Sequence, residues 1–354
     1  MLYEELYMRR CIELAMNGLG NVAPNPMVGC VIVHNDSVVG EGFHAVFGGP
    51  HAEVAAINAV KNKEILKECT LYVSLEPCCH YGKTPPCADK IIETGIRKVV
   101  VGIRDPFAQV QGKGIARLQE AGVEVVEGVL QAGCSTLNKR FFTFHQKKRP
   151  YVILKWAQSL DGFIDKERSD NEPQINWITD EKTRVLVHRW RSEEQAILTG
   201  KNTVLMDNPQ LTVREWHGKN PLRLVIDRGL DISSSAKIMD DTAQTVIFNS
   251  LKDDVCGNIE YKKLDFSKNI IPELLTFLYN KNIQSLIIEG GLVTLQSFID
   301  AGCWDEARVF SGNCFFFGGT RAPLIKGSLE SIQNIGADKL SLITNNSDDF
   351  LSKL

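Results

Sequence analysis

The sequence lacks the features that mark membrane, secreted and nucleic-acid-binding proteins. None of its apolar runs approaches the ~18 residues that a membrane-spanning helix requires. Its first residues, Met1 to Glu5, contain neither a basic start nor an apolar core, so we expect no signal peptide. The net charge is only −3, and the longest basic cluster, Lys147 to Arg149, is too short for a nucleic-acid-binding surface. We therefore expect a cytoplasmic protein without nucleic-acid or membrane partners.

A disulfide framework is not expected either, although the chain contains ten cysteines. In a cytosolic protein of this size, most cysteines are small buried apolar residues rather than halves of disulfides. Only Cys78, Cys79 and Cys87 cluster near a histidine in the sequence. Cysteine chemistry is therefore expected at this one place in the chain.

Strand and helix patterns alternate along the 354 residues, and a polar, basic break at 138–150 interrupts them. Before the break we expect helices at 3–17, 51–60, 87–93 and 114–121, with strands at 28–33, 37–43, 71–75, 97–102 and 123–126. Asn35-Asp36 between the first two strands indicates a hairpin turn. After it we expect strands at 151–156, 196–198, 222–226, 245–248 and 285–288, with helices at 180–191, near 203, at 271–280 and at 292–299. The alternation predicts two α/β domains, 1–145 and 146–354, each with helices on the faces of a sheet.

The most informative pattern joins His51, Glu53, Cys78 and Cys87. One histidine and two cysteines can hold a zinc ion and leave its fourth position open, as catalytic zinc sites do. Glu53 follows the histidine by two residues and is not needed as a ligand. In zinc deaminases the zinc activates a water, and such a glutamate carries its proton to the amino leaving group. The eight residues between Cys78 and Cys87 contrast with the two that are usual in nucleobase deaminases.

Two other interpretations of these residues remain open. The cysteines can be two buried thiols, or they can belong to a structural zinc site completed by Cys79 or His80. We favour a catalytic site because the histidine, the glutamate and both cysteines occur in the right order. Asn25 precedes an expected core strand, and its amide can hydrogen-bond the edge of a pyrimidine.

Several longer segments resemble the bifunctional deaminase–reductases of riboflavin biosynthesis. In the first half these are Pro24-Asn25-Pro26-Met27-Val28-Gly29, Pro50-His51-Ala52-Glu53 and Leu75-Glu76-Pro77-Cys78-Cys79-His80-Tyr81-Gly82-Lys83-Thr84-Pro85-Pro86-Cys87. In the second half they are Ser159-Leu160-Asp161-Gly162, Trp177-Ile178-Thr179, Ala196-Ile197-Leu198-Thr199-Gly200, Asp207-Asn208-Pro209-Gln210-Leu211-Thr212-Val213-Arg214 and Glu289-Gly290-Gly291. The eight-residue gap distinguishes this family from cytidine, guanine and tRNA-adenosine deaminases.

The resemblance implies a cytidine-deaminase-like three-layer α/β/α domain followed by a dihydrofolate-reductase-like α/β domain. The first domain is expected to hydrolyse the 2-amino group of 2,5-diamino-6-ribosylamino-4-pyrimidinone 5′-phosphate. The second is expected to reduce the ribosyl side chain to ribityl with NADPH. We therefore expect one zinc ion per chain, NADPH, a small pyrimidine ribose phosphate as substrate, and a homo-oligomer.

The resemblance also assigns roles to individual residues. His51, Cys78 and Cys87 are the expected zinc ligands, and Glu53 is the expected proton carrier. The positions that match cofactor contacts are Ala157, Trp177, Thr203, Asp207, Gly291, Leu292, Val293, Thr294, Leu295, Gln296 and Ser297. The positions that match substrate contacts are Ile175, Arg191, Leu211, Arg214 and Glu289. The chain departs from the family pattern at Ile175 and Arg228, where relatives carry serine.

Physical reasoning supports part of this assignment. Gly290 and Gly291 follow an apolar strand and open a helix, and glycines there let backbone N–H groups approach a dinucleotide phosphate. Arg191 and Arg214 can clamp a sugar phosphate bidentately, and Lys155 can aid opening of the ribosylamine. Without the resemblance, a plain strand–turn–helix and two surface ion pairs are the simpler interpretation.

Two functions of other classes are alternatives. The first is a single-activity deaminase whose second domain is only a scaffold; the retained Asp207 and Gly290-Gly291 argue against it. The second is an RNA-binding or regulatory module on a deaminase fold. The presence of Glu53 and the absence of a basic or aromatic-rich stripe in the sequence argue against that interpretation.

Overall fold

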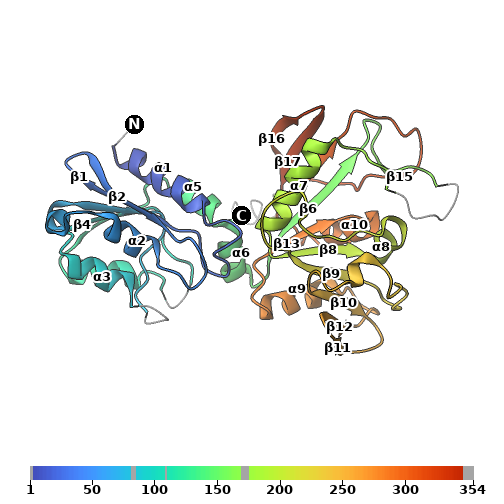
Figure 1. The fold of residues 1–354 in the computed structure, drawn as a ribbon, viewed down its shortest axis with the longest axis horizontal. Coiled ribbons are helices and arrows are strands. Elements are labelled where there is room, and N and C mark those ends of the chain that lie inside the picture. The colour runs from blue at the N-terminus through green and yellow to red at the C-terminus, as the bar shows by residue number, and fades with distance from the viewer. Residues whose placement is uncertain (1–2, 81–84, 108–109, 169–174, 346–354) are drawn as a thin grey trace, which may run out of the picture. The chain divides into compact units, whose positions relative to one another are not determined.

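The computed structural model describes residues 3–80, 85–107, 110–168 and 175–345, which form two compact units (Figure 1). Unit 1 comprises Met1–Lys148 and unit 2 comprises Arg149–Leu354. The division at 145–146 expected from the sequence lies inside α6 (Lys139–Lys147), a few residues before the boundary between the units. None of the helices described combines the length and apolar character that crossing a bilayer requires.

Unit 1 is built on a five-stranded sheet of order β2-β1-β3-β4-β5. The strands are β1 (Gly29–His34), β2 (Ser37–Phe43), β3 (Thr70–Val73), β4 (Lys98–Val101) and β5 (Glu124–Glu127). β1 runs antiparallel to β2 and β3, whereas β3, β4 and β5 are parallel. A tight turn at Asn35-Asp36 joins β1 to β2, and both residues have positive φ (46° and 57°). This geometry is that of the hairpin turn favoured by Asn and Asp, as the sequence predicted.

Helices cover both faces of this sheet. They are α1 (Tyr3–Met16), α2 (Ala52–Ala59), α3 (Cys87–Thr94), α4 (Lys113–Glu120), α5 (Gln131–Leu137) and α6, with a 3₁₀ helix at Lys63–Glu68. Alternate residues of β1 point to opposite faces. Cys30 and Ile32 join a buried cluster with α2, α3 and α4, whereas Val31 and Val33 join one with α1 and α5. Unit 1 therefore has the three-layer α/β/α architecture that the resemblance implied.

The segment expected to be a break is a helix and part of the core. Phe141 and Phe144, three residues apart on α6, are both buried, so they give this basic helix an apolar face. Asn138, between α5 and α6, accepts a hydrogen bond from the backbone N–H of Met27 and donates one to its carbonyl, each 2.8 Å long. The basic residues concealed this helix, because its apolar side chains are few.

Unit 2 contains a ten-stranded sheet of order β11-β12-β10-β9-β8-β13-β6-β14-β17-β16. The strands are β6 (Tyr151–Gln158), β8 (Ala196–Gly200), β9 (Leu222–Ile226), β10 (Thr245–Asn249), β11 (Asp254–Cys256), β12 (Ile259–Lys263), β13 (Ser285–Glu289), β14 (Glu306–Ser311), β16 (Ser328–Ile335) and β17 (Asp338–Thr344). β7 (Phe163–Asp165) and β15 (Thr320–Arg321) form a separate pair. The strands from β12 to β14 are parallel, and antiparallel strands close both edges.

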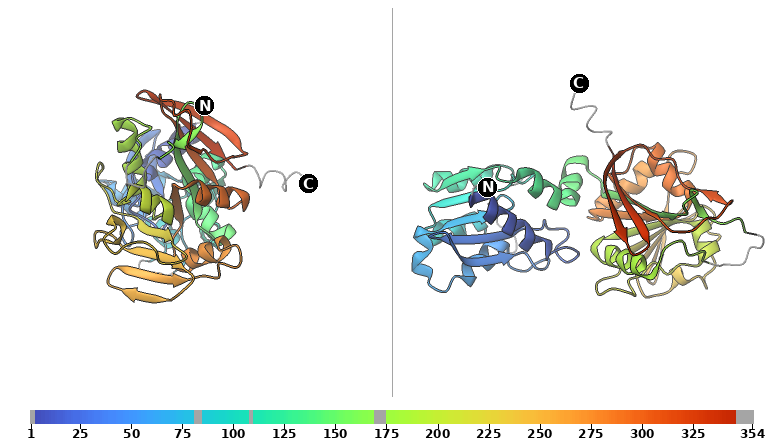
Figure 2. Two further views of the ribbon diagram at one scale, coloured as in Figure 1. Left: turned by 90° about the vertical axis from the view of Figure 1, so that its right-hand side faces the viewer. Right: turned by 90° about the horizontal axis from the view of Figure 1, so that it is seen from above.

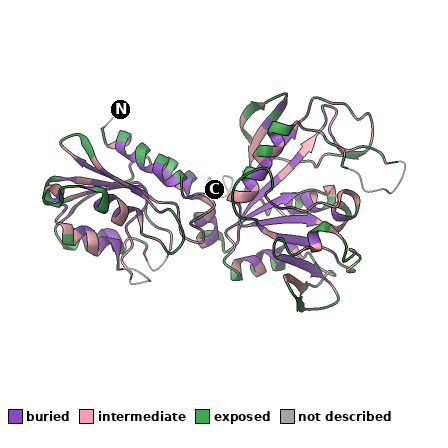
Figure 3. Cartoon of the chain, viewed as in Figure 1, coloured by how far each residue is buried: buried purple, intermediate pink, exposed green. Residues whose placement is uncertain are grey.

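Two buried clusters lie on the two faces of this sheet, whose central strands are buried in Figure 3. α9 (Ile271–Asn280) and α10 (Leu292–Asp300) pack on one face, and α7 (Glu181–Glu193) and α8 (Lys201–Asp207) pack on the other. The β16–β17 hairpin, red in Figure 2, was not expected from the sequence. β16 is mostly exposed and therefore lacks the apolar alternation that identifies a half-buried strand.

Gly29 shows why one motif residue must be glycine. A Cβ atom at this position would overlap the backbone carbonyl of Cys11, because β1 lies directly against α1. We predict that Gly29→Ala destabilises the protein by about 3 kcal/mol or more, since two backbones would have to separate. Thermal unfolding followed by circular dichroism measures the change. Gly133→Ala on α5 is the matched control, because its Cβ would meet only the tip of Ile12. Alanine also favours a helix, so an equal loss of stability in both variants would contradict this explanation.

Candidate active sites

Three side chains from separate segments of unit 1 converge on one point. His51 is the residue before α2, Cys78 follows β3, and Cys87 is the first residue of α3. Their ligand atoms all lie within 4.8 Å of one another, and they are the three-residue group able to hold a metal ion among the described residues. His51 Nδ1 is 3.2 Å from Cys87 Sγ and 3.5 Å from Cys78 Sγ. The group includes all three residues that the sequence suggested as zinc ligands.

The donor set and its spacing fit a zinc ion. Bonds of about 2.3 Å to sulfur and about 2.1 Å to nitrogen place two ligands of one tetrahedron roughly 3.5–3.8 Å apart, close to the separations seen here. The backbone N–H of Cys87 also donates to Cys78 Sγ over 3.3 Å. Hydrogen bonds from the Cys87 thiol and from His51 lower the pKa of Cys78 to about 4, so this sulfur is a ready thiolate. Three ligands leave a fourth position for a reacting group, as catalytic sites require.

Glu53 lies beside this group in the first turn of α2. Only 3% of its surface is exposed, and burial together with the Cys78 thiolate raises the pKa of its carboxyl to about 7. Its side chain accepts a hydrogen bond from Cys87, but it is not a member of the three-residue group. A buried carboxyl next to three candidate metal ligands is well placed to accept and return a proton.

The residues left open as competing ligands lie outside the group. Cys79 is half-buried, and its burial raises the pKa of its thiol. His80 is exposed and packs edge-on against Phe107, with ring centroids 6.2 Å apart. Gly82, Lys83 and Thr84 of the same motif lie outside the described residues. Among those described, Cys78 and Cys87 are therefore the cysteines that face His51.

Asn25 is held by His44, a residue that the sequence analysis missed. His44 Nδ1 lies 2.9 Å from the carbonyl of Pro50, and its Nε2 lies 3.1 Å from Asn25 Nδ2. Because a carbonyl can only accept, the hydrogen-bond pattern assigns the ring proton to Nδ1, and Nε2 accepts from the Asn25 amide. Burial lowers the pKa of His44, so the neutral ring is favoured. No donor to Asn25 Oδ1 is found among the described residues, so this oxygen can accept from an N–H group of a ligand.

Glu76 is a second residue that the sequence analysis missed. Its buried carboxylate, immediately before Pro77-Cys78, accepts four backbone hydrogen bonds of 2.9–3.3 Å from Asp105, Gly112, Gly114 and Ile115. These donors include the N-terminus of α4, where a carboxylate is favourable. These bonds fix the segment that carries Cys78 to residues 105–115, which lie more than 25 residues further along the chain. The only sequence signal is an acidic residue inside an otherwise apolar strand end.

In unit 2, a pair of glycines connects β13 to α10. Gly290 and Gly291 have φ of 103° and 65°, which favour glycine, and Cβ atoms there would lie 3.1–3.2 Å from atoms of Thr203. The N-cap of α10 is Gly291, which has no side chain to hydrogen-bond the first backbone N–H groups of the helix. The Thr199 hydroxyl, also near Gly290, is buried and has no hydrogen-bond partner among the described residues. The turn thus brings Thr203, Gly291 and Thr294 together.

A charged cluster surrounds Glu289 at the end of β13. Arg191 donates to both carboxylate oxygens over 2.9 and 2.8 Å, and Lys155 Nζ is 3.4 Å away. Burial would raise the pKa of Glu289, but these two cations lower it to about 2. Arg191 also donates to the carbonyl of Thr212 and Arg214 to its hydroxyl, both over 3.2 Å. Three cations therefore gather around Glu289, and an anionic ligand would balance them.

Other residues assigned to cofactor or substrate have different surroundings. Leu211 and Leu295 are buried in the core, so only their backbones can reach a ligand. The guanidinium of Arg184 lies 4.5 Å above the exposed ring of Trp177, and Asp207 pairs with Arg168 over 2.9 Å. Ile175 is exposed, and Ala157 is half-buried on β6, where it pairs with Phe310 of β14. Leu292, Val293, Gln296 and Ser297 lie on α10, where Gln296 instead bonds Asp300 and the backbone of Leu324.

Both units match known protein families. Residues 1–103 match the family described as "Cytidine and deoxycytidylate deaminase zinc-binding region", and residues 150–345 match the "RibD C-terminal domain". The riboflavin biosynthesis proteins RibD of Bacillus amyloliquefaciens and Synechocystis are 41% and 38% identical; the alignments cover 96% and 93% of this chain and 93% and 89% of those proteins.

Two solved structures resemble the whole chain. One is the diaminohydroxyphosphoribosylaminopyrimidine deaminase/5-amino-6-(5-phosphoribosylamino)uracil reductase of Thermotoga maritima, with a TM-score of 0.88, 38% identity and coverage of 97% of this chain and 99% of that one. The other is RibD of Acinetobacter baumannii, with a TM-score of 0.86, 31% identity and coverage of 97% and 98%. Because the likeness in sequence and fold extends over both units, this chain belongs to the RibD family of riboflavin biosynthesis proteins.

Proposed function

We propose that this chain catalyses two successive steps of riboflavin biosynthesis. Unit 1 hydrolytically deaminates 2,5-diamino-6-(5-phosphoribosylamino)pyrimidin-4-one with zinc, and unit 2 reduces the ribosyl group of the product to ribityl with NADPH. The observation that carries this proposal is the convergence of His51, Cys78 and Cys87 beside the buried Glu53. The name of the Thermotoga maritima relative states both activities for that protein.

In the deaminase site, His51 Nδ1 and the sulfurs of Cys78 and Cys87 would hold the zinc. The ion would supply a water whose pKa is brought down toward neutrality. In the hydrolysis, the oxygen of that water bonds to C2 of the pyrimidine and the bond from C2 to the amino nitrogen breaks. Glu53 would carry one of the water's two protons to a ring nitrogen and the other to the amino group, which leaves as ammonia. Asn25, oriented by His44, presents its Oδ1 to an N–H group of the pyrimidine. Glu76 holds the Cys78 segment in place during these steps.

In the reductase site, NADPH would supply a hydride. The glycine turn and the first N–H groups of α10 hold a phosphate of the cofactor. Because Glu289 occupies the fork of Arg191, we assign the substrate phosphate mainly to Arg214, with Arg191 as a nearby positive charge. Lys155 lies beside Glu289 and can protonate the ring oxygen when the ribosylamine opens, which leaves C1′ as the electrophile.

We also propose that the chain forms a homo-oligomer. The supporting feature is β16, which lies at the edge of the ten-stranded sheet and exposes Leu329 and Ile332. An exposed edge strand with apolar side chains is a ready surface for pairing with another chain. Sedimentation equilibrium of the purified protein tests this proposal, and a monomer at micromolar concentration would contradict it.

Substitution of single cysteines tests the ligand assignment. The purified protein should contain about one zinc ion per chain, and Cys87→Ser should lose both the metal and deamination, because two ligands do not hold zinc tightly. Cys79→Ser should keep both, since Cys79 lies outside the ligand group. Atomic absorption measures the metal. If Cys79→Ser empties the site, Cys79 is a ligand and the assignment is wrong.

Substitution of Glu53 tests its role in proton transfer. Glu53→Gln should retain zinc and NADPH-dependent reduction but lose roughly 10²–10⁴-fold in deamination rate, the usual contribution of a positioned acid–base group. Zinc content, deamination and reduction are measured on the same preparation. Glu68→Gln is the matched control, because Glu68 in the same unit is exposed. Comparable deamination by the Glu53 and Glu68 variants would rule out the proton-carrier role.

An isotope experiment tests the reduction. NADPH is deuterated at one C4 position of the nicotinamide and then, in a second run, at the other; NMR locates the label in the ribityl product. In one of the two runs deuterium should appear at C1′, because the opened ribosylamine is electrophilic at that carbon. Gly291→Val should weaken NADPH binding, since its side chain would enter the space next to Thr203. Absence of deuterium from C1′ in both runs would refute direct hydride transfer.

A further inference from the structure

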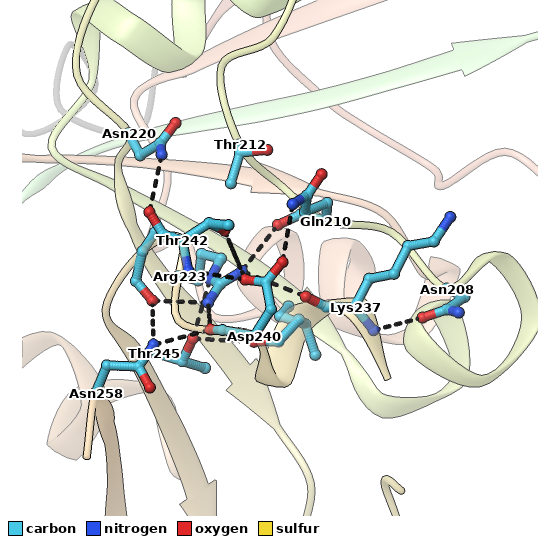
Figure 4. Close-up of polar contacts among 12 residues, drawn as sticks. Asn208, Gln210, Thr212, Asn220, Arg223, Lys237, Asp240, Thr242, Thr245 and Asn258 are labelled. Atoms are coloured by element: carbon cyan, nitrogen blue, oxygen red, sulfur yellow. Dashed lines mark hydrogen bonds and ion pairs between the residues drawn. The ribbon is translucent and has the colours of Figure 1, made fainter. Parts of the chain in front are cut away.

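Arg223 on β9 is the largest fully buried side chain among the described residues. Its guanidinium lies at the centre of the polar contacts in Figure 4 and connects three segments of unit 2. The contacts run from Nε to Thr245 Oγ1 (3.0 Å), from Nη1 to Asp240 Oδ1 (2.7 Å) and the Gln210 carbonyl (3.4 Å), and from Nη2 to the carbonyls of Asp240 (2.6 Å) and Ala243 (2.7 Å). A buried arginine requires such compensation, and here it comes largely from loops rather than from the sheet.

Asp240 supplies the negative charge that balances Arg223, and each of its two carboxylate oxygens accepts a hydrogen bond from a different segment. Oδ1 accepts from Arg223, and Oδ2 accepts from Gln210 Nε2 over 2.8 Å. Partial burial would raise the pKa of Asp240, but hydrogen bonds from Thr242, Arg223 and Gln210 lower it to about 2. Asp240 is therefore ionised at any working pH and fixes both Arg223 and Gln210.

Gln210 belongs to a loop, residues 208–214, whose backbone is unusual. Asn208 and Leu211 have φ of 41° and 55°, a region that residues other than glycine seldom adopt. Such a conformation persists only where its surroundings determine it. Asn208 Oδ1 accepts from the backbone N–H of Lys237 over 2.8 Å, and Asn220 Oδ1 accepts from that of Val213 over 2.8 Å. With Gln210 in the middle, the loop is tied at three points to the segments around Arg223.

The same loop makes different contacts on the side of the proposed reductase site. The carbonyl of Thr212 accepts from Arg191, and its hydroxyl accepts from Arg214. The backbone N–H of Arg214 donates to His188 Nδ1 over 3.1 Å. Burial and the nearby arginines lower the pKa of His188 to about 4, so a neutral ring is available as this acceptor. One short loop therefore joins the Arg223–Asp240 pair to the arginines around Glu289.

We infer that Arg223 and Asp240 are positioning residues of the reductase site. They hold loop 208–214 in place, so that Thr212 orients Arg214 toward the phosphate of the substrate and keeps the positive charge of Arg191 nearby. The inference rests on the proposed reductase function and extends it to residues that do not touch the substrate. A pair that only stabilised the fold would need no contact with this loop, whereas Gln210 bonds to both members of the pair.

The test compares Asp240→Asn with the wild-type, full-length protein. Removing the charge frees Gln210 and leaves Arg223 unbalanced, so the loop should lose its fixed backbone. We expect KM for 5-amino-6-(5-phosphoribosylamino)uracil to rise by about tenfold, the effect of weakening one hydrogen bond to a charged group. KM for NADPH and the deamination rate should stay within about twofold of wild type, a range in which binding free energies barely change. Asp253→Asn is the matched control, because the exposed Asp253 pairs with Lys262 away from the loop.

A dephosphorylated substrate separates positioning from general damage. If the pair aligns Arg214 with the phosphate, Asp240→Asn should raise KM for the phosphorylated substrate and leave KM for the riboside nearly unchanged. Gln210→Met keeps the buried ion pair intact and should also raise KM for the phosphorylated substrate alone. This variant replaces Asp240→Asn in the test if Asp240→Asn does not fold. Equal increases of KM for both substrates, or no increase in either variant, would overturn the inference. A wild-type protein without reductase activity would instead overturn the proposed function, and this inference with it.

Discussion

The packing of α2 and α3 on one face of the five-stranded sheet is the constraint on which the deaminase site depends. It brings His51 and Cys87, 36 residues apart, to hydrogen-bonding distance at the first turns of two neighbouring helices. Cys78 arrives from the end of β3, so the ligand group forms where strand ends and helix starts meet, as ligand sites of α/β proteins commonly do. Glu53 lies in the first turn of α2, which begins directly after His51, so the helix that positions the histidine also positions the glutamate.

Both units use a buried charge to fix the loop that carries their site. In unit 1 the Glu76 carboxylate gathers four backbone N–H groups and fixes the segment of Cys78. In unit 2 the Arg223–Asp240 pair gathers backbone carbonyls and Gln210 and fixes the loop of Arg214. A charge is suited to this task because several hydrogen bonds from different segments can converge on it, and because leaving it unpaired would be costly. Rigid support of this kind is what positioned catalytic groups require.

Features that depend on short-range residue patterns could be predicted from the sequence, whereas contacts with groups distant in the chain could not. Most strands and helices, the Asn35-Asp36 turn and the glycine turn after β13 follow from short-range patterns. The candidate metal ligands were recognised from their residue types and order, whereas their convergence depends on the packing of α2 and α3. His44, Glu76 and Arg223 were given no role because each depends on groups far along the chain. These include the Asn25 amide 19 residues from His44, the Ile115 N–H 39 residues from Glu76 and the Gln210 carbonyl 13 residues from Arg223. α6 was taken for a break because its basic residues outnumber the two phenylalanines that bury it. Arg191 was expected to clamp a phosphate, but only the structure reveals that Glu289 already occupies its fork.

The most direct test of the account is to identify products by mass after incubating the zinc-loaded protein with the diaminopyrimidinone phosphate. Without NADPH, the account predicts a single product in which one amino group has been exchanged for oxygen, with release of ammonia. With NADPH, it predicts that this product is replaced by one carrying two further hydrogens on the sugar side chain. Two results would contradict the claim that one chain carries out both steps. One is deamination that is never followed by reduction, even with NADPH; the other is a substrate that stays unchanged with and without NADPH.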